Sequence, residues 1–236
     1  NLISMSVWTG LCGLIDSGKG LVGGFADRVW TFFAGDAEAR REYAFTAAII
    51  SLAAKMAKAD GVVTTLEVNA FRRLFDVPPG DERNVERLFN IARQDVAGYD
   101  AYAARIAGLY GRGAPLMEDI LDALFAIATA DDLVHEAELA YLSDVAEILG
   151  VEERAFERIK ARHVVPQEGD PYLLLGADRA MSDGELRRHY LALVADTHPD
   201  RLIARGVPQE FLVIATRRLA VINSAWDRVA AERGIR

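Results

Sequence analysis

Cysteine, lysine and runs of β-branched residues are scarce in this sequence of 236 residues. The single cysteine, Cys12, excludes an intramolecular disulfide and a structural zinc site built from several cysteines. Only four of the 27 basic residues are lysines, and the net charge of −8 disfavours nucleic acid as a partner, because binding it requires clustered positive charge. The scarcity of β-branched runs, together with only seven prolines, favours helices over strands. We therefore expect an acidic, soluble, mostly helical protein of a reducing compartment.

The first 35 residues are apolar and rich in glycine, but charged residues interrupt them. A membrane-spanning helix needs about 20 consecutive apolar residues, whereas Asp16, Lys19, Asp27 and Arg28 divide this segment. The segment also lacks the basic leader and the cleavage site of a signal peptide. We expect it to pack on the next domain or to lie at a membrane surface. The expected location is the cytoplasm, including the inner face of the membrane.

Residues 13–20 come one residue short of a phosphate-binding loop. The pattern GxxxxGK[ST] ends in a hydroxyl residue that holds magnesium, and Gly20 stands at that place. Such a loop must also follow a buried strand, and no segment rich in Val or Ile precedes Gly13. The sequence therefore disfavours a P-loop nucleotidase.

Residues 36–162 have helical periodicity throughout. Apolar side chains recur three or four residues apart, which places them on one face of a helix. Pro115 is placed to open a helix and Gly150 to end one. The expected buried stripes are Phe45, Ile49, Leu52 and Met56; Val68, Phe71 and Phe75; Leu88, Ile91 and Ala92; Ile120, Leu121, Leu124, Phe125 and Ala128; and Tyr141, Leu142, Val145, Ile148 and Leu149.

Two stretches of this region, residues 56–67 and 127–138, repeat each other at an offset of 71 residues. Each has the end of an apolar helix, an aspartate, a turn with two aliphatic residues, and a helix start that carries glutamate. If a pseudo-twofold axis relates the two copies, four carboxylates converge and could bind a divalent cation through oxygen. The alternative is that they cap helices and interact favourably with helix dipoles. The four residues are Asp60, Glu67, Asp131 and Glu138.

Residues 38–160 resemble the TerB-like family, named for a tellurite-resistance protein, through this repeated feature in a helical region. The resemblance implies an all-helical bundle with a link to metal binding or stress. It carries no catalytic residue onto this chain.

Charge and composition change at residues 163–169. The 67 residues from 170 to 236 carry ten basic and nine acidic side chains, whereas residues 1–169 carry 17 basic and 26 acidic ones. Pro166, Gly169 and Pro171 interrupt the helical periodicity there. We expect an apolar N-terminal segment at 1–35, a helical domain at 36–162, a linker at 163–169 and a small domain at 170–236.

The last 67 residues predict an antiparallel helical hairpin. A helix begins at Ser182 with the spacing of a capping box, and Pro208 is placed to open a longer one. Between them, Pro199 disfavours the helical conformation of His198. His198, Pro199 and Asp200 would then form a polar recognition point in the turn, and no serine, cysteine or metal-ligand spacing accompanies them to indicate catalysis.

Residues 170–236 resemble a J domain, the module of DnaJ-type co-chaperones. Tyr172, Leu175 and Gly176 match its opening D-x-Y-x-x-L-G, and the tripeptide at 198–200 matches its His-Pro-Asp signature. A TerB-like region followed by a J domain resembles the DjlA branch of the family. The resemblance implies a protein that is not an enzyme, uses no cofactor, and stimulates ATP hydrolysis by a DnaK-type chaperone. The DnaK-binding residues that it implies are His198, Pro199, Asp200, Arg187, Arg188 and Arg201.

Two features depart from the family pattern. Leu191, Ala192 and Asp196 stand where a J domain usually has basic residues, and the N-terminal segment is more charged than the usual glycine-rich anchor. The alternative function is therefore a metal- or ligand-sensing stress module with a secondary or degenerate J domain. In either case the TerB-like region would select a location, a client or a membrane-associated partner, and a homodimer is compatible with the sequence.

Overall fold

The computed structural model describes residues 7–17, 37–59, 71–72, 77–94, 98–129, 134–164 and 168–235, and every regular element within these ranges is a helix. This confirms the all-α fold class. The N-terminal bundle consists of α1 (Val7–Ser17), α3 (Ala37–Ala59), α5 (Glu82–Gln94), α6 (Tyr99–Tyr110), α7 (Pro115–Ala128), α8 (Glu136–Leu149) and α9 (Glu153–Val164). The C-terminal segment, residues 170–236, contains α10 (Pro171–Leu175), α11 (Asp183–Asp196), α12 (Pro199–Arg205), the 3₁₀ turn η1 (Gln209–Phe211) and α13 (Val213–Arg233).

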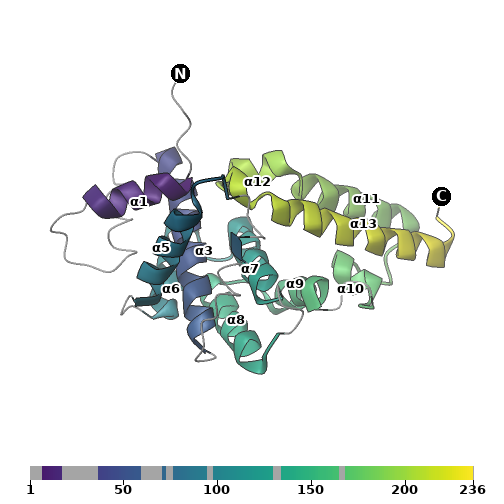
Figure 1. Ribbon diagram of the computed structural model, residues 1–236. Coiled ribbons are helices and arrows are strands. Elements are labelled where there is room, and N and C mark those ends of the chain that lie inside the picture. Colours follow the sequence, from purple (N-terminus) through teal and green to yellow (C-terminus); the bar gives the residue numbers. More distant parts are fainter. Residues whose placement is uncertain are drawn as a thin grey trace, which may run out of the picture.

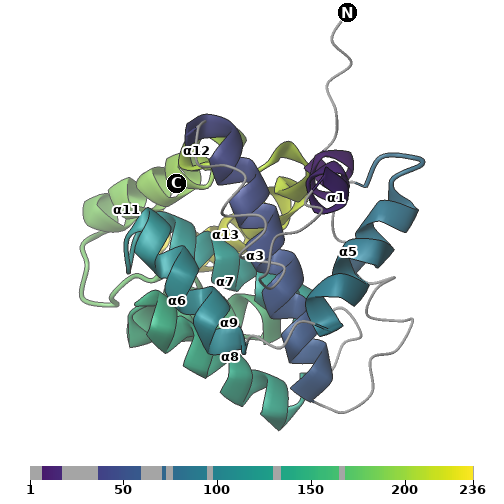
Figure 2. The same ribbon diagram turned by 90° about the vertical axis from the view of Figure 1, so that its left-hand side faces the viewer.

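Helix α3 is the central element of the N-terminal bundle. It packs against α5 on one side and against α6, α7 and α8 on the other (Figure 2). The predicted stripe of Phe45, Ile49, Leu52 and Met56 is buried along it, because these side chains share one helical face. Two predicted helix ends are also confirmed, since Pro115 opens α7 and Gly150 ends α8 in the left-handed conformation (φ 76°).

Helix α1 is part of this bundle. Trp8 and Leu11 are fully buried, and α1 packs against α3 and α5 (Figure 1). Residues 13–17 continue that helix, so this part of the glycine-rich pattern is not a phosphate-binding loop. None of the helices that the structure describes is long and apolar enough to cross a bilayer.

Helices α11 and α13 lie side by side as the predicted antiparallel hairpin, with α10 packed against α13 (Figure 1). The small core between these three helices contains Tyr172, Leu174, Leu175, Leu186, Ile222, Ala225 and Val229. At the surface, the Tyr190 ring stacks on Trp226 with 4.6 Å between centroids, and the Tyr190 hydroxyl donates to Asn223. The stack and the hydrogen bond join α11 to α13.

The connection between α11 and α13 differs from the sequence prediction. Pro208 does not open the long helix; it precedes η1, and α13 begins at Val213. An additional helix, α12, begins at Pro199 and ends at Gly206, whose φ of 97° is accessible mainly to glycine. Proline at the first helical position loses no hydrogen bond, so Pro199 both ends α11 and starts α12.

One hydrophobic core extends from the N-terminal bundle into the C-terminal segment. Leu202, Val207, Phe211, Ile214 and Ala215 are buried in the same cluster as the side chains of α1, α3 and α7. The Phe211 ring lies 5.7 Å from Trp8 and 5.1 Å from Phe45, centroid to centroid. The start of α13 therefore packs on the bundle, whereas its later turns pack on α10 and α11.

Candidate functional site

His198 occupies the N-cap position of α12. Its backbone is extended (φ −61°, ψ 138°), and its Nδ1 accepts a hydrogen bond of 3.2 Å from the backbone N–H of Asp200. This satisfies one of the amide groups that every helix start leaves without an intrahelical partner. Because Nδ1 is the acceptor, a neutral imidazole carries its proton on Nε2.

The tripeptide is exposed although its flanks are packed. The side chains of His198 and Asp200 are 59% and 87% exposed, and Nδ1 of His198 lies 3.5 Å from a carboxylate oxygen of Asp200. Thr197 and Leu202, on either side, are 2% exposed. The Thr197 hydroxyl donates to the carbonyl of Leu193 in the last turn of α11. The structure thus holds two polar side chains outward on a rigid backbone.

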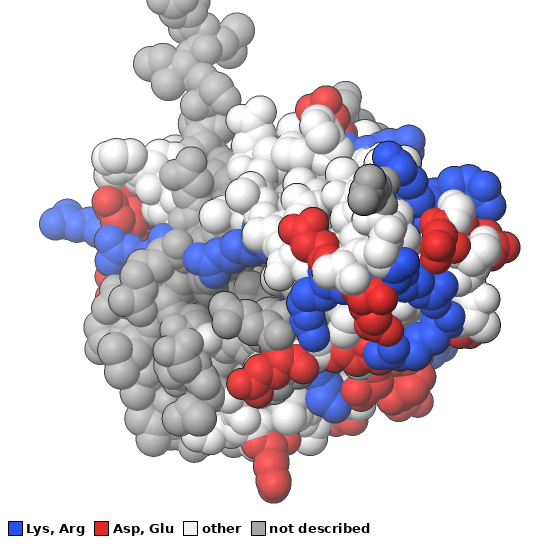
Figure 3. Space-filling model, turned by 90° about the vertical axis from the view of Figure 1, so that its right-hand side faces the viewer, with Lys and Arg blue, Asp and Glu red and all other residues white. Residues whose placement is uncertain are grey.

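Basic side chains precede and follow the tripeptide in the sequence. Arg187 and Arg188 are exposed on α11, and Arg201 is exposed on α12. At the other end of the hairpin, Figure 3 shows basic side chains mixed with acidic ones rather than one continuous basic patch. His189 makes an internal contact, because its Nε2 lies within hydrogen-bond distance (2.9 Å) of the carbonyl oxygen of Leu175.

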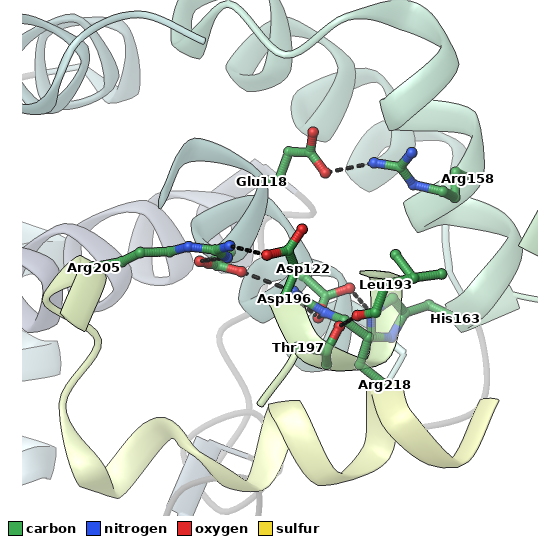
Figure 4. A network of polar contacts seen from close by, with 10 residues as sticks. Glu118, Asp122, Arg158, His163, Leu193, Asp196, Thr197, Arg205 and Arg218 are labelled. Atoms are coloured by element: carbon green, nitrogen blue, oxygen red, sulfur yellow. Dashed lines mark hydrogen bonds and ion pairs between the residues drawn. The ribbon is translucent and has the colours of Figure 1, made fainter. Parts of the chain in front are cut away.

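An acidic pair on α7, Asp119 and Asp122, forms ion pairs with the C-terminal segment. Asp119 lies 2.8 Å from Arg218 of α13 and 3.4 Å from Arg205 of α12. Asp122 lies 2.8 Å from Arg218 and 3.1 Å from His163 of α9. Figure 4 shows Arg205, Arg218 and His163 converging on this site from three elements.

Burial makes these charges depend on one another. Burial alone would raise the pKa of Asp122, but the charge of Arg218 and the contact with His163 outweigh it and hold the pKa well below its ordinary value. Burial likewise opposes the charge of Arg218, and the two aspartates together raise its pKa above the ordinary value. Each partner therefore stabilises the charged form of the other.

Sequence reasoning missed this network. The sequence signal is a pair of aspartates, three residues apart, in an apolar helix. From Ile120 to Ala128, all residues except Asp122 are apolar and buried. Carboxylates in such a stretch are rarely tolerated without partners. However, the two arginines that pair with them lie 86 to 99 residues further along the chain, so a local pattern cannot reveal the pairing.

Of the four carboxylates expected to converge, only Glu138 can be placed. It is buried, and it accepts a hydrogen bond of 2.9 Å from the backbone N–H of His135, so it caps α8. Asp60, Glu67 and Asp131 lie outside the described residues. Within the described ranges, no group of three or more His, Cys, Asp or Glu side chains is arranged to hold a metal ion.

Comparison with known proteins gives results for both parts of the chain. Residues 46–161 match the family described as tellurite resistance protein TerB. The chain is 30% identical over 197 residues to the co-chaperone protein DjlA of Shewanella oneidensis, covering 77% of this chain and 75% of that protein. It is 25% identical to the Vibrio cholerae protein of that name, covering 87% and 84%, and 26% identical to the Coxiella burnetii one, covering 76% and 74%. No solved structure matches the chain significantly.

Proposed function

Because this chain belongs to the DjlA family of co-chaperone proteins, we propose that it binds a DnaK-type chaperone through its C-terminal segment and stimulates that chaperone's ATP hydrolysis. The observation that carries the proposal is the exposed tripeptide at the start of α12. His198 and Asp200 project from a backbone whose neighbours are buried, so a partner can contact them without rearranging the fold.

The exposed groups have distinct chemistry. The Nε2–H of His198 can donate a hydrogen bond to the partner, while the carboxylate of Asp200 can accept one. Pro199 fixes the backbone between them. Arg187, Arg188 and Arg201 would attract an acidic surface of the chaperone and raise the rate of association.

In this proposal the chain regulates an enzyme and performs no catalytic step of its own. The N-terminal bundle would choose the location or the partner, including a client or a membrane-associated protein. Two properties of the whole chain stay predictions: a location in the cytoplasm or at the inner face of the membrane, and assembly as a homodimer.

The direct test is steady-state ATP hydrolysis by a purified DnaK-type chaperone with and without the full chain. The parent protein should accelerate hydrolysis, and His198→Gln and Asp200→Asn should remove the acceleration even at saturating concentration. Asp200→Asn changes an exposed side chain and should keep the parent's unfolding free energy to within about 0.5 kcal/mol. His198→Gln also removes the N-cap acceptor of α12, so it should lower that free energy by about 0.5–2 kcal/mol and leave the protein folded. A His198→Gln protein that stimulates as well as the parent would disprove the proposal.

Reversing the charge of two arginines tests separately whether basic side chains speed the association with the chaperone. Replacing Arg187 and Arg188 with glutamate should raise the chain concentration needed for half-maximal stimulation, because opposite charges would then repel an acidic partner. Added salt should weaken the parent's stimulation and narrow its difference from the variant. Asp227→Asn, at an exposed position of α13, is the charge-altering control.

A further inference from the structure

The acidic pair on α7 contacts both α12, in the connection of the hairpin, and the start of α13. Asp119 binds Arg205, the last residue of α12, and Arg218, in the second turn of α13. Asp122 binds Arg218 through a second carboxylate, so this guanidinium spans both aspartates. The side chains of Asp119, Asp122 and Arg218 are 3%, 2% and 9% exposed, which excludes most water from the contact.

Arg205 links this contact to the exposed tripeptide. Its other terminal nitrogen lies 3.8 Å from Asp196, the last residue of α11. The ion pair between Asp196 and Arg205 therefore joins the two ends of the segment 197–204, which contains the tripeptide. Leu202, on the inner face of α12, is buried in the core of the N-terminal bundle.

We propose that Asp119, Asp122, Arg205 and Arg218 are positioning residues, which hold His198 and Asp200 in one orientation relative to the N-terminal bundle. The inference rests on the function proposed above, because it assigns a role in stimulating the DnaK-type chaperone. None of the four residues needs to touch the chaperone. They act by keeping the tripeptide in the orientation that the chaperone binds.

The expected consequence is a change in apparent affinity rather than in maximal effect. A protein that holds its binding-competent arrangement for only a fraction of the time binds more weakly by that fraction. If a loosened hairpin is correctly oriented about a tenth of the time, half-maximal stimulation requires about ten times more protein. Saturating protein should restore full stimulation, because His198 and Asp200 are unchanged.

Two variants weaken the contact and one control leaves it intact. Asp119→Asn weakens the pairs with both arginines, and Arg205→Gln weakens the less buried pair, since Arg205 is 24% exposed. The control is Glu118→Gln, on the same helix. It breaks an ion pair of 2.6 Å between α7 and Arg158 of α9, and this pair does not involve α12 or α13.

Orientation is measured without the chaperone, by pulsed electron paramagnetic resonance between spin labels at Asn90→Cys on α5 and Ala192→Cys on α11. Both positions are exposed, and a Cys12→Ala background avoids a third label. The parent and Glu118→Gln should give one narrow distance distribution. Asp119→Asn and Arg205→Gln should broaden it.

Chaperone ATPase assays on the unlabelled proteins complete the test. Asp119→Asn and Arg205→Gln should raise the half-maximal concentration about tenfold at unchanged maximal stimulation, whereas Glu118→Gln should match the parent. If Asp119→Asn fails to fold, the milder variant Arg205→Gln decides whether the positioning role holds. Narrow parent-like distances in these variants, or broadened distances with an unchanged half-maximal concentration, would overturn the positioning role. Absence of any stimulation by the parent would instead overturn the proposed function.

Discussion

At the scale of single residues, His198 has two roles that substitutions can separate. Its Nδ1 caps α12, and its side chain is more than half exposed, so a partner can contact the imidazole. The cap contributes to stability whatever binds the protein, whereas the exposed part of the ring matters only to a partner. A residue that caps equally well but has no imidazole therefore distinguishes the two roles.

We predict that His198→Asn preserves the free energy of unfolding, because Asn is among the best N-cap residues. His198→Ala removes the capping acceptor and should lower that free energy by about 0.5–2 kcal/mol. Urea unfolding measures both values. Neither variant should stimulate a DnaK-type chaperone. Stimulation that survives in His198→Asn but not in His198→Ala would show that the partner needs the capped backbone rather than the imidazole.

At the scale of elements, α1 packs against α3 at Gly10, where there is no room for a side chain. A Cβ atom on Gly10 would collide with the ring of Tyr43, whereas a Cβ on Gly13, one turn later, would meet nothing within 4 Å. Both glycines lie inside the same helix. They therefore form a matched pair in which only the packing differs.

We predict opposite effects for alanine at these two positions. Gly10→Ala should destabilise the protein by about 1–3 kcal/mol, because the added methyl group must displace the Tyr43 ring from its place against α1. Gly13→Ala should stabilise it by about 0.5–1 kcal/mol through higher helix propensity. Urea unfolding at neutral pH distinguishes them. Equal effects of the two changes would mean that α1 is not packed on α3 as described.

The contacts among α7, α9 and α13 make stability depend on pH. The pKa of Asp122 is lowered in the folded protein, so the unfolded chain binds more protons as the pH approaches the ordinary aspartate value near 3.9. The contribution of Asp122 is therefore complete well above pH 4. It is lost progressively as the pH falls toward its lowered folded pKa.

We predict that the unfolding free energy of the parent decreases between about pH 5 and pH 3 more steeply than that of Asp122→Asn. At neutral pH the variant should be less stable by about 3–5 kcal/mol, because Arg218 loses one buried partner. Urea unfolding at several pH values gives both results. Asp227→Asn, with an exposed carboxyl group, should follow the parent; parallel curves for Asp122→Asn and the parent would contradict the prediction.

At the scale of the whole molecule, Phe211 connects three distant parts of the chain. It belongs to the C-terminal segment by position, yet it is fully buried against Trp8 of α1 and Phe45 of α3. Asp119 and Asp122 add a polar contact between the N-terminal bundle and the C-terminal segment. The two parts should therefore unfold together.

We predict one cooperative transition for the full chain, with Phe211→Ala lowering its free energy of unfolding by about 3–5 kcal/mol. Far-ultraviolet circular dichroism and tryptophan fluorescence should give coincident curves in both proteins. Leu191→Ala, at a side chain 54% exposed, should change stability by less than about 0.5 kcal/mol. Separate transitions for the two probes would show that the C-terminal segment unfolds on its own.

The sequence by itself determined the features that depend on neighbouring residues. Apolar spacing predicted the buried faces of α3 and α7, Gly150 marked the end of α8, and Ser182 with Glu185 predicted the start of α11. The capping box there is confirmed by hydrogen bonds between these two residues. Such features need only a few consecutive residues, because helix caps and periodic faces are local.

Only the tertiary structure decided how the two parts of the chain meet. The packing of Phe211 on α1, and the pairing of Asp119 with Arg205 and Arg218, join residues far apart in the sequence. The same packing explains why α13 begins later than Pro208, since η1 turns Phe211 into the core before the helix starts. Long-range burial selects among many arrangements that local patterns allow equally, so no short motif could reveal it.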